Sequence, residues 1–173
     1  MNSINILIVE DDQKMATILG DWFEMYNEKR ESLFLSWETA GSVMTAIDRL
    51  MLPGIDVCLL DVNLPNGQGV GTVMKLLCAS PETPVVVLTG DDSKELEAAC
   101  RGVGRVDDYV RKSELGQGVD VSELVWKLHC AAQKFAWRSQ IAVKYKQQMD
   151  RIREEKTTSS AMIAEKIEEC RLE

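Results

Sequence analysis

An aspartate follows a mostly apolar stretch near the middle of the chain. The segment DVCLLD (56–61) runs through apolar residues into Asp61, and the turn-forming segment VNLPNGQG (62–69) follows at once. Such a run is typical of a buried strand that ends at a turn. Burying a carboxylate there raises the free energy of the folded state unless the group has a partner or a chemical role. Asp61 is therefore the first candidate for a reactive residue.

Polar side chains also end three other expected strands. They are the acidic residues Glu10, Asp11 and Asp12 after INILIV, the hydroxyl of Thr89 after PVVVL, and the amine of Lys112 after DYVR. In open α/β sheets the functional groups gather beyond the carboxyl ends of the strands. We therefore expect these groups and Asp61 to lie in one crevice.

The expected cluster combines several carboxylates with one hydroxyl and one amine. Two carboxylates about 4 Å apart repel by roughly 4 kcal/mol at an effective dielectric constant of 20, so the cluster needs a cation. Oxygen ligands with one or two direct carboxylates suit Mg²⁺, which also bridges to phosphate. Asp61 beside Mg²⁺ is suited to attack a phosphoryl donor in line and form an aspartyl-phosphate. Lys112 would neutralise charge on the phosphoryl oxygens, and Thr89 would hydrogen-bond one of them.

The elements that must position these groups alternate between strand and helix. The expected strands are 4–10, 32–38, 56–61, 83–90 and 107–112, with helical patterns at 12–26, 40–51, 69–79 and 92–100. A fifth helix is expected to begin near Val121. Short apolar runs bounded by turn residues are typical of central parallel strands. The sequence predicts a doubly wound α/β fold with a five-stranded parallel sheet.

Composition excludes several classes of protein. The net charge of −8 argues against a broad electrostatic grip on nucleic acid or an anionic membrane. No apolar run approaches the length of a membrane span. The five cysteines are odd in number and lack metal-ligand spacing, so we expect reduced thiols in a cytoplasmic protein. The single histidine, His129, rules out a histidine-based metal cage and is expected to be a plain helix residue.

Four motifs in this order resemble the receiver domain of bacterial response regulators. They are ILIVEDD (6–12), LLDVNLPNGQG (59–69), PVVVLTG (84–90) and DYVRKS (108–113). The resemblance covers residues 4–133 and implies a flavodoxin-like fold with strand order 2-1-3-4-5. It implies a two-component signalling protein rather than an enzyme. The phosphodonor would be a sensor histidine kinase or a histidine phosphotransfer protein.

The resemblance also assigns roles to individual residues. Asp61 would be the phosphoacceptor and a metal ligand, and Asp11 would be a direct Mg²⁺ ligand. Glu10 would act through metal-bound water, and Asn63 would offer its backbone carbonyl to the metal. Thr89 and Lys112 keep the roles argued above. Tyr109 would be an aromatic switch coupled to Thr89, turning inward on phosphorylation, whereas Asp12 is extra to the acidic pair and is expected to cap the first helix. One departure from the family pattern is Ser113, where proline usually follows the lysine.

Two other functions remain open from the residues. An aspartate-nucleophile phosphatase of the haloacid-dehalogenase type also uses Asp, Mg²⁺, Thr and Lys on an α/β sheet. That family places its nucleophile after the first strand with a second aspartate as acid/base, whereas Asp61 follows the third expected strand and begins the sequence DVN. The other alternative is an interaction module that keeps the fold without being phosphorylated. An incomplete acidic pocket would indicate it.

Residues 134–173 differ in composition from residues 1–133. The first part holds 11 Lys and Arg against 21 Asp and Glu, and the second holds 9 against 7, with no Gly or Pro. We therefore expect a receiver domain at 1–133 and a helical tail at 134–173. The segment TTSS (157–160) has poor helix propensity and is expected to mark a hinge, a break or a new N-cap.

A heptad frame runs from the fifth helix into this tail, which favours pairing with another helix. Its apolar positions are Leu124, Leu128, Ala131, Phe135, Ala142, Tyr145, Met149, Ile152, Ile163 and Cys170, interrupted at Arg138, Lys156 and Ser159. The tail is expected to form a homodimer or relay a signal, and a solvated helix without a partner is the alternative. It lacks the histidine of a phosphotransfer helix and the basic surface of a DNA-binding domain. With no C-cap glycine at its end, the chain is expected to be a fragment of a longer regulator.

Overall fold

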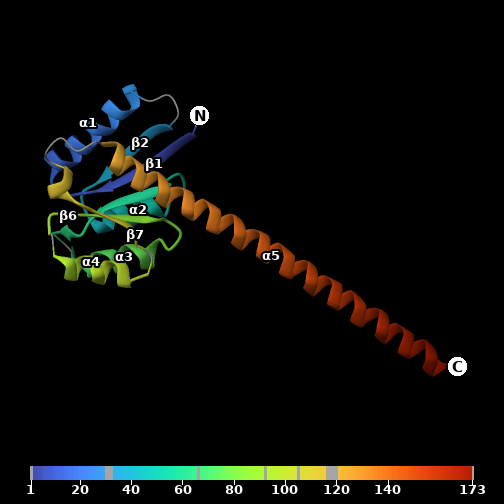
Figure 1. The fold of residues 1–173 in the computed structure, drawn as a ribbon. Coiled ribbons are helices and arrows are strands. Elements are labelled where there is room, and N and C mark those ends of the chain that lie inside the picture. Colours follow the sequence, from blue (N-terminus) through green and yellow to red (C-terminus); the bar gives the residue numbers. More distant parts are fainter. Residues whose placement is uncertain are drawn as a thin grey trace. The chain divides into compact units, whose positions relative to one another are not determined.

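A computed structural model of the chain describes residues 2–29, 33–65, 67–91, 93–104, 106–115 and 121–172 (Figure 1). Beyond Glu154, only the side chain of Thr157 is described. The chain divides into two compact units, Met1–Phe135 and Ala136–Glu173.

The first unit is built on a five-stranded parallel sheet. Its strands are β1 (Asn2–Val9), β2 (Leu33–Ala40), β3 (Val57–Asp61), β6 (Val85–Thr89) and β7 (Val106–Arg111). They lie in the order β2-β1-β3-β6-β7, which is the predicted order 2-1-3-4-5. Every residue of β3 and β6 is buried, as their continuous apolar sequences predict. The predicted doubly wound fold is confirmed.

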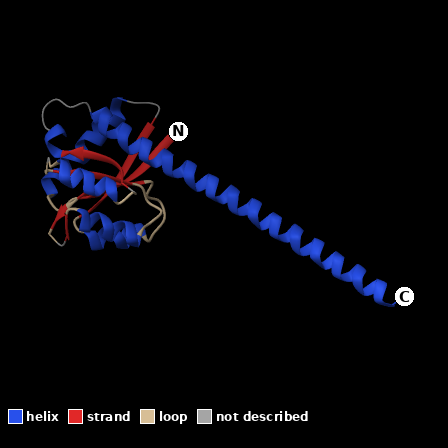
Figure 2. Cartoon of the chain, turned by 60° about the horizontal axis from the view of Figure 1, so that its bottom comes forward, coloured by secondary structure: helices blue, strands red, loops and turns tan. Residues whose placement is uncertain are grey.

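Helices cover both faces of this sheet (Figures 1 and 2). They are α1 (Gln13–Lys29), α2 (Val43–Leu50), α3 (Val70–Ala79), α4 (Lys94–Gly102), the 3₁₀ helix η1 (Lys112–Leu115) and α5 (Val121–Leu172). One apolar core packs α1 and the first part of α5 against the sheet, through side chains such as Phe23 and Leu128. The other core packs α2, α3 and α4 against the opposite face, through side chains such as Ala46, Leu76 and Cys100. Two such covered faces leave only the strand ends and edges for function.

Two features differ from the sequence prediction. The turn after Asp61 contains a small antiparallel hairpin of β4 (Asn63–Leu64) and β5 (Gly67–Gln68), which was not predicted. The predicted break at TTSS is wrong, because α5 continues through these residues. The hydroxyl of Thr157 donates to the carbonyl of Arg153 at 2.9 Å, so it bonds back within the helix rather than capping a new one.

The second unit is a continuation of α5. Large apolar side chains of Ala136–Glu154 reach solvent at Trp137, Ile141, Val143, Tyr145 and Ile152. None of the described helices combines the length and apolarity needed to cross a bilayer. The heptad positions Lys156, Ser159, Ile163 and Cys170 lie outside the described side chains.

Candidate functional site

Asp61 lies at the carboxyl end of β3 with both carboxylate oxygens engaged. Its Oδ2 accepts a hydrogen bond of 2.7 Å from Nζ of Lys112, and its Oδ1 accepts one of 2.9 Å from the backbone N–H of Asn63. Nζ of Lys112 also lies 2.6 Å from Oε2 of Glu10. Asp61 is 3% exposed and Glu10 is 4% exposed. One ammonium group therefore bridges two buried carboxylates that come from different strands.

Burial and pairing act in opposite directions on these groups. Burial raises the pKa of Glu10 above its usual value, the ion pair with Lys112 opposes that rise, and the charge of Asp61 adds to it. Burial alone would lower the pKa of Lys112, but its bonds to Asp61 and Glu10 outweigh burial and hold that pKa above its usual value. Lys112 is therefore charged at neutral pH and is a fixed positive centre beside Asp61.

A third carboxylate, that of Asp11, completes an oxygen cluster. One oxygen from each of Glu10, Asp11 and Asp61 lies within 4.8 Å of the others, and Asp11 is exposed. Three carboxylates against one ammonium leave an excess of negative charge, and oxygen donors of this kind are those that Mg²⁺ prefers. The residues present therefore fit a magnesium ion, and the cluster is open to solvent on the side of Asp11.

Asp12 stands apart from the cluster as a helix cap. Its Oδ1 accepts a hydrogen bond of 2.9 Å from the backbone N–H of Lys14, and its carbonyl accepts one from Ala16 in the first turn of α1. These are the contacts of an N-cap residue. Its own N–H donates to Glu10 at 3.3 Å, so the cap also orients the buried glutamate.

The loop that follows Asp61 is fixed from behind by Thr72 of α3. Thr72 is fully buried, and its hydroxyl donates to the carbonyl of Val62 at 3.2 Å, where the N–H of Gly69 also donates at 2.9 Å. A Cβ on Gly67 would lie 2.5 Å from Oγ1 of Thr72, so this turn needs glycine. Sequence reasoning missed Thr72, because nothing in its neighbours distinguishes it from a plain helix residue.

Thr89 and Tyr109 are linked through Asp91. Thr89 is fully buried at the end of β6, and its Oγ1 accepts a hydrogen bond of 3.0 Å from the N–H of Asp91. The hydroxyl of Tyr109 donates to the carbonyl of Asp91 at 3.3 Å, and this side chain is 5% exposed. Burial raises the pKa of Tyr109, while a hydrogen bond with Thr89 opposes the rise. The tyrosine already lies inward here, where it finds an acceptor for its hydroxyl.

The structure thus brings most of the predicted site residues to the same end of the sheet. Glu10, Asp11, Asp61 and Lys112 form direct contacts or one cluster, and Asn63 contacts Asp61 through its N–H. The role predicted for the carbonyl of Asn63 remains a prediction. Lys112 begins η1 with Ser113 as the next residue, and the described residues contain no cis peptide bond.

The sequence profile of the response regulator receiver domain family matches residues 6–119. The transcriptional regulatory protein CpxR of Escherichia coli K12 is 30% identical over 135 residues, which are 78% of this chain and 52% of CpxR. The protein-glutamate methylesterase/protein-glutamine glutaminase of Symbiobacterium thermophilum is 28% identical over 134 residues, or 75% of this chain and 35% of the enzyme. The chain thus spans about a third to a half of these curated relatives.

Solved structures show the same fold. The CheY-like response regulator receiver domain from Methanospirillum hungatei superposes with a TM-score of 0.63 at 19% identity, covering 79% of this chain and 99% of that chain. The receiver domain of the Francisella response regulator 1452 superposes with a TM-score of 0.61 at 21% identity, covering 76% of this chain and 98% of that chain.

Proposed function

The chain belongs to the response regulator receiver domain family, and from this premise we propose that Asp61 accepts a phosphoryl group from a phosphohistidine. The donor would be a sensor histidine kinase or a histidine phosphotransfer protein. The observation that carries the proposal is the bridge of Lys112 between Asp61 and Glu10, with Asp11 beside them. Phosphorylation and magnesium binding are typical of this family.

In the proposed reaction, an oxygen of Asp61 attacks the phosphorus atom in line with the bond to the leaving group. The new P–O bond forms as the P–N bond of phosphohistidine breaks, and the leaving nitrogen takes up a proton. Asp11 and Asp61 would hold Mg²⁺ directly, Glu10 through water, and Asn63 through its carbonyl. When bound, this ion supplies positive charge for the phosphoryl oxygens. Lys112 supplies a second positive charge from its fixed place, 2.7 Å from Oδ2 of Asp61.

The proposed output passes through Thr89 to the face formed by α4, β7 and α5. The hydroxyl of Thr89 would donate to a phosphoryl oxygen, and its movement toward that oxygen would displace the N–H of Asp91, which donates to the same hydroxyl. Because Tyr109 donates to the carbonyl of the same Asp91, a shift of this residue would reach β7. The backbone of Asp91 would therefore connect the two residues of the predicted switch, because its N–H bonds to Thr89 and its carbonyl bonds to Tyr109.

The domain organisation completes the proposal. We assign residues 1–133 to the receiver domain and residues 134–173 to a signalling tail that pairs with the tail of a second copy. Exposed apolar side chains of Trp137, Ile141 and Tyr145 support such pairing. The module would catalyse only its own phosphorylation and dephosphorylation, and it would bind neither nucleic acid nor a membrane directly.

The test uses two small phosphodonors in the presence of Mg²⁺. Acetyl phosphate transfers from oxygen, and phosphoramidate transfers from nitrogen as phosphohistidine does. We expect one acid-stable, base-labile phosphate per chain by intact mass, absent in Asp61→Asn and reduced in Asp11→Ala. Asp48→Asn, which changes an exposed aspartate of α2, is the control and should be phosphorylated normally. A phosphate that persists in Asp61→Asn would overturn the assignment.

A further inference from the structure

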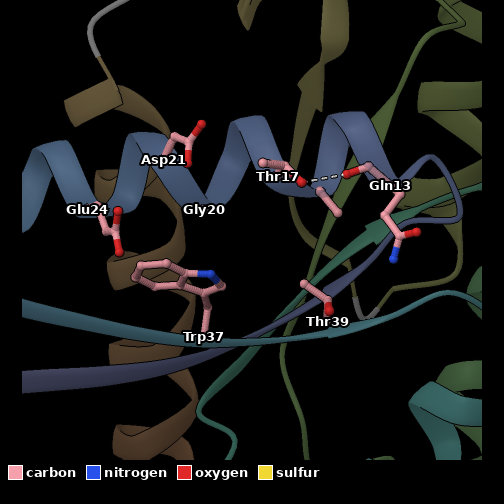
Figure 3. A pocket seen from close by; sticks show the side chains of 8 residues that line it. Gln13, Thr17, Gly20, Asp21, Glu24, Trp37 and Thr39 are labelled. Carbon is pink, nitrogen blue, oxygen red and sulfur yellow. Dashed lines mark hydrogen bonds between the residues drawn. The ribbon is translucent and has the colours of Figure 1, made fainter.

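A groove separates α1 from β2, the outermost strand of the sheet (Figure 3). It contains a cavity of about 290 Å³, lined on the helix side by Gln13, Thr17, Gly20 and Glu24 and on the strand side by Trp37 and Thr39. A second hollow of about 590 Å³ shares Glu24 and Trp37 as walls and extends the groove along the strand. The pocket around Asp61 contributes no residue to either hollow.

The position of Trp37 in this groove is fixed by its neighbours. Figure 3 shows its indole ring beneath the helix at Gly20, where an added Cβ would lie 3.0 Å from Nε1. Phe23 packs edge-on against the ring at 5.7 Å between centroids. A glycine inside a helix lowers stability by roughly 0.5–1 kcal/mol relative to alanine. Gly20 therefore lowers the stability of α1 but leaves the space in which the indole ring of Trp37 lies.

The backbone of β2 is open for pairing along part of this groove. In a strand, the N–H and C=O of one residue point to the same side, and those of the next residue point to the opposite side. The carbonyl of Ala40 accepts from Glu10 on the inner side, whereas Leu35 exchanges two hydrogen bonds of 2.9 Å with the side-chain amide of Asn27. By this alternation, the backbone N–H and C=O groups of Trp37 and Thr39 point to the same open edge as those of Leu35. The amide of Asn27 occupies the edge at Leu35 in the way a neighbouring peptide group would.

The walls of the groove are acidic. Glu24 and Glu28 line it from α1, and Figure 3 shows Glu24 directed toward Trp37, whereas the side chain of Asp21 points away from it. Within the described part of the chain, none of these three carboxylates forms an ion pair. By contrast, Glu38 on the same strand is paired with Arg49 at 2.6 Å. The negative charge is therefore available to a cation from outside.

We propose that this groove binds an extended, basic segment of a partner protein, which adds as a strand to the open edge of β2 at Trp37 and Thr39. Backbone groups of these two residues would pair with the segment, in the mode of β-strand addition. Alternate Lys or Arg side chains of the segment would point toward α1, because every second side chain of a strand shares a face. A cation there meets the ring of Trp37 and the carboxylate of Glu24. This surface serves recognition and does not depend on phosphorylation of Asp61.

The experiment uses the full chain and a capped nine-residue peptide of alternating arginine and valine. Binding is followed by ¹⁵N NMR, through the amide signals of Trp37 and Thr39 and the indole N–H of Trp37. We expect these signals to shift most, and Glu24→Lys to weaken binding at least tenfold. Glu95→Lys makes the same change of charge on an exposed residue of α4 and should alter binding less than twofold.

Two further peptides separate backbone pairing from charge alone. A version N-methylated on the edge-facing amides should bind at least tenfold more weakly, and a version with glutamate in place of arginine should not bind. The proposal is overturned if no peptide binds, if the N-methylated peptide binds equally well, or if both lysine variants weaken binding equally. It is also overturned if the edge amides become protected with rising protein concentration alone, since a second copy of the chain would then occupy the edge.

Discussion

The acidic pocket around Asp61 and the stretch of α5 after Phe135 depart in opposite directions from the usual pattern, in which charged groups are exposed and large apolar groups are buried. The pocket buries the charges of Glu10 and Asp61, whereas the helix leaves Trp137 and Tyr145 each 65% exposed. Charged side chains are rarely buried unless they are paired, and large exposed apolar stripes on helices usually contact a partner. Each arrangement is unfavourable by itself, so each indicates a task.

The two regions differ in where the compensation comes from. Lys112 brings a counter-charge to the pocket from the same chain, so the pocket is held in place before any ligand arrives. Among the described residues, the apolar side chains of α5 after Phe135 stay exposed, and in the proposed dimer a second tail helix would cover them. The cluster around Asp61 is therefore preorganised within one chain, whereas the proposed pairing of α5 involves a second one.

The most severe way to break this comparison is to remove the counter-charge. In Lys112→Met, Asp61 and Glu10 lose their positive neighbour, and the phosphoryl oxygens lose a fixed charge. We expect phosphorylation by acetyl phosphate to slow by about a hundredfold or more, as for the loss of one preorganised electrostatic contact. Lys94→Met, on an exposed residue of α4, is the control. Equal initial rates in the two variants would show that the bridge has no part in the reaction.

A charge placed in the exposed stripe tests the other half of the comparison. At 100° per residue, Trp137, Ile141, Tyr145 and Ile152 lie on one side of α5, and Val143 lies on the opposite side. Ile141→Glu should weaken self-association by roughly ten- to a hundredfold, since burial of one such side chain contributes about 1.5–3 kcal/mol. Val143→Glu should leave it unchanged. Sedimentation equilibrium measures both, and a wild-type chain that stays monomeric would favour the solvated-helix alternative.

The fold was predictable because burial on both faces leaves a plain signature in a strand. The apolar runs of β3 and β6 predicted central parallel strands, and their ends located Asp61 and Thr89. The hairpin β4–β5 could not be predicted in this way, because strands of two residues have no periodicity. The break at TTSS was wrong because Ser and Thr lower helix stability by at most about 0.7 kcal/mol per residue, which does not by itself interrupt a long helix.

The site was predictable as a set of residues and less so as a geometry. The ends of parallel strands must share one edge of the sheet, which is why Glu10, Asp61 and Lys112 could be grouped from sequence. The inward position of Tyr109 and the support from Thr72 depend on packing between elements, which single-residue patterns do not carry. The heptad frame likewise passed over Trp137 and Ile141, which lie beside it on the exposed side of α5.

A smaller effect is expected from the hydrogen bond behind the pocket. In Thr72→Val, the buried carbonyl of Val62 keeps the N–H of Gly69 but loses the hydroxyl, so we expect the free energy of unfolding to fall by about 1 kcal/mol. Thr72→Ser should recover most of this loss. Urea unfolding measures stability, and titration with Mg²⁺ reports whether the loop is displaced. If the valine variant is as stable as the serine variant, the hydroxyl does not fix the loop.

The smallest effect concerns pH and separates Tyr109 in the receiver from Tyr145 in the tail. Because burial raises the pKa of Tyr109 above its usual value near 10, the folded chain keeps this proton at pH values where the unfolded chain has lost it. Stability linked to this group is therefore complete below pH 10 and decreases as pH rises above 10. Tyr109→Phe removes that decrease, so the difference in unfolding free energy between wild type and variant should be constant below pH 10 and change only above it.

Tyr145→Phe, in the exposed stretch of α5, is the matched control. Parallel stability profiles for wild type and Tyr109→Phe across pH 8 to 11 would contradict the buried, inward position of this side chain.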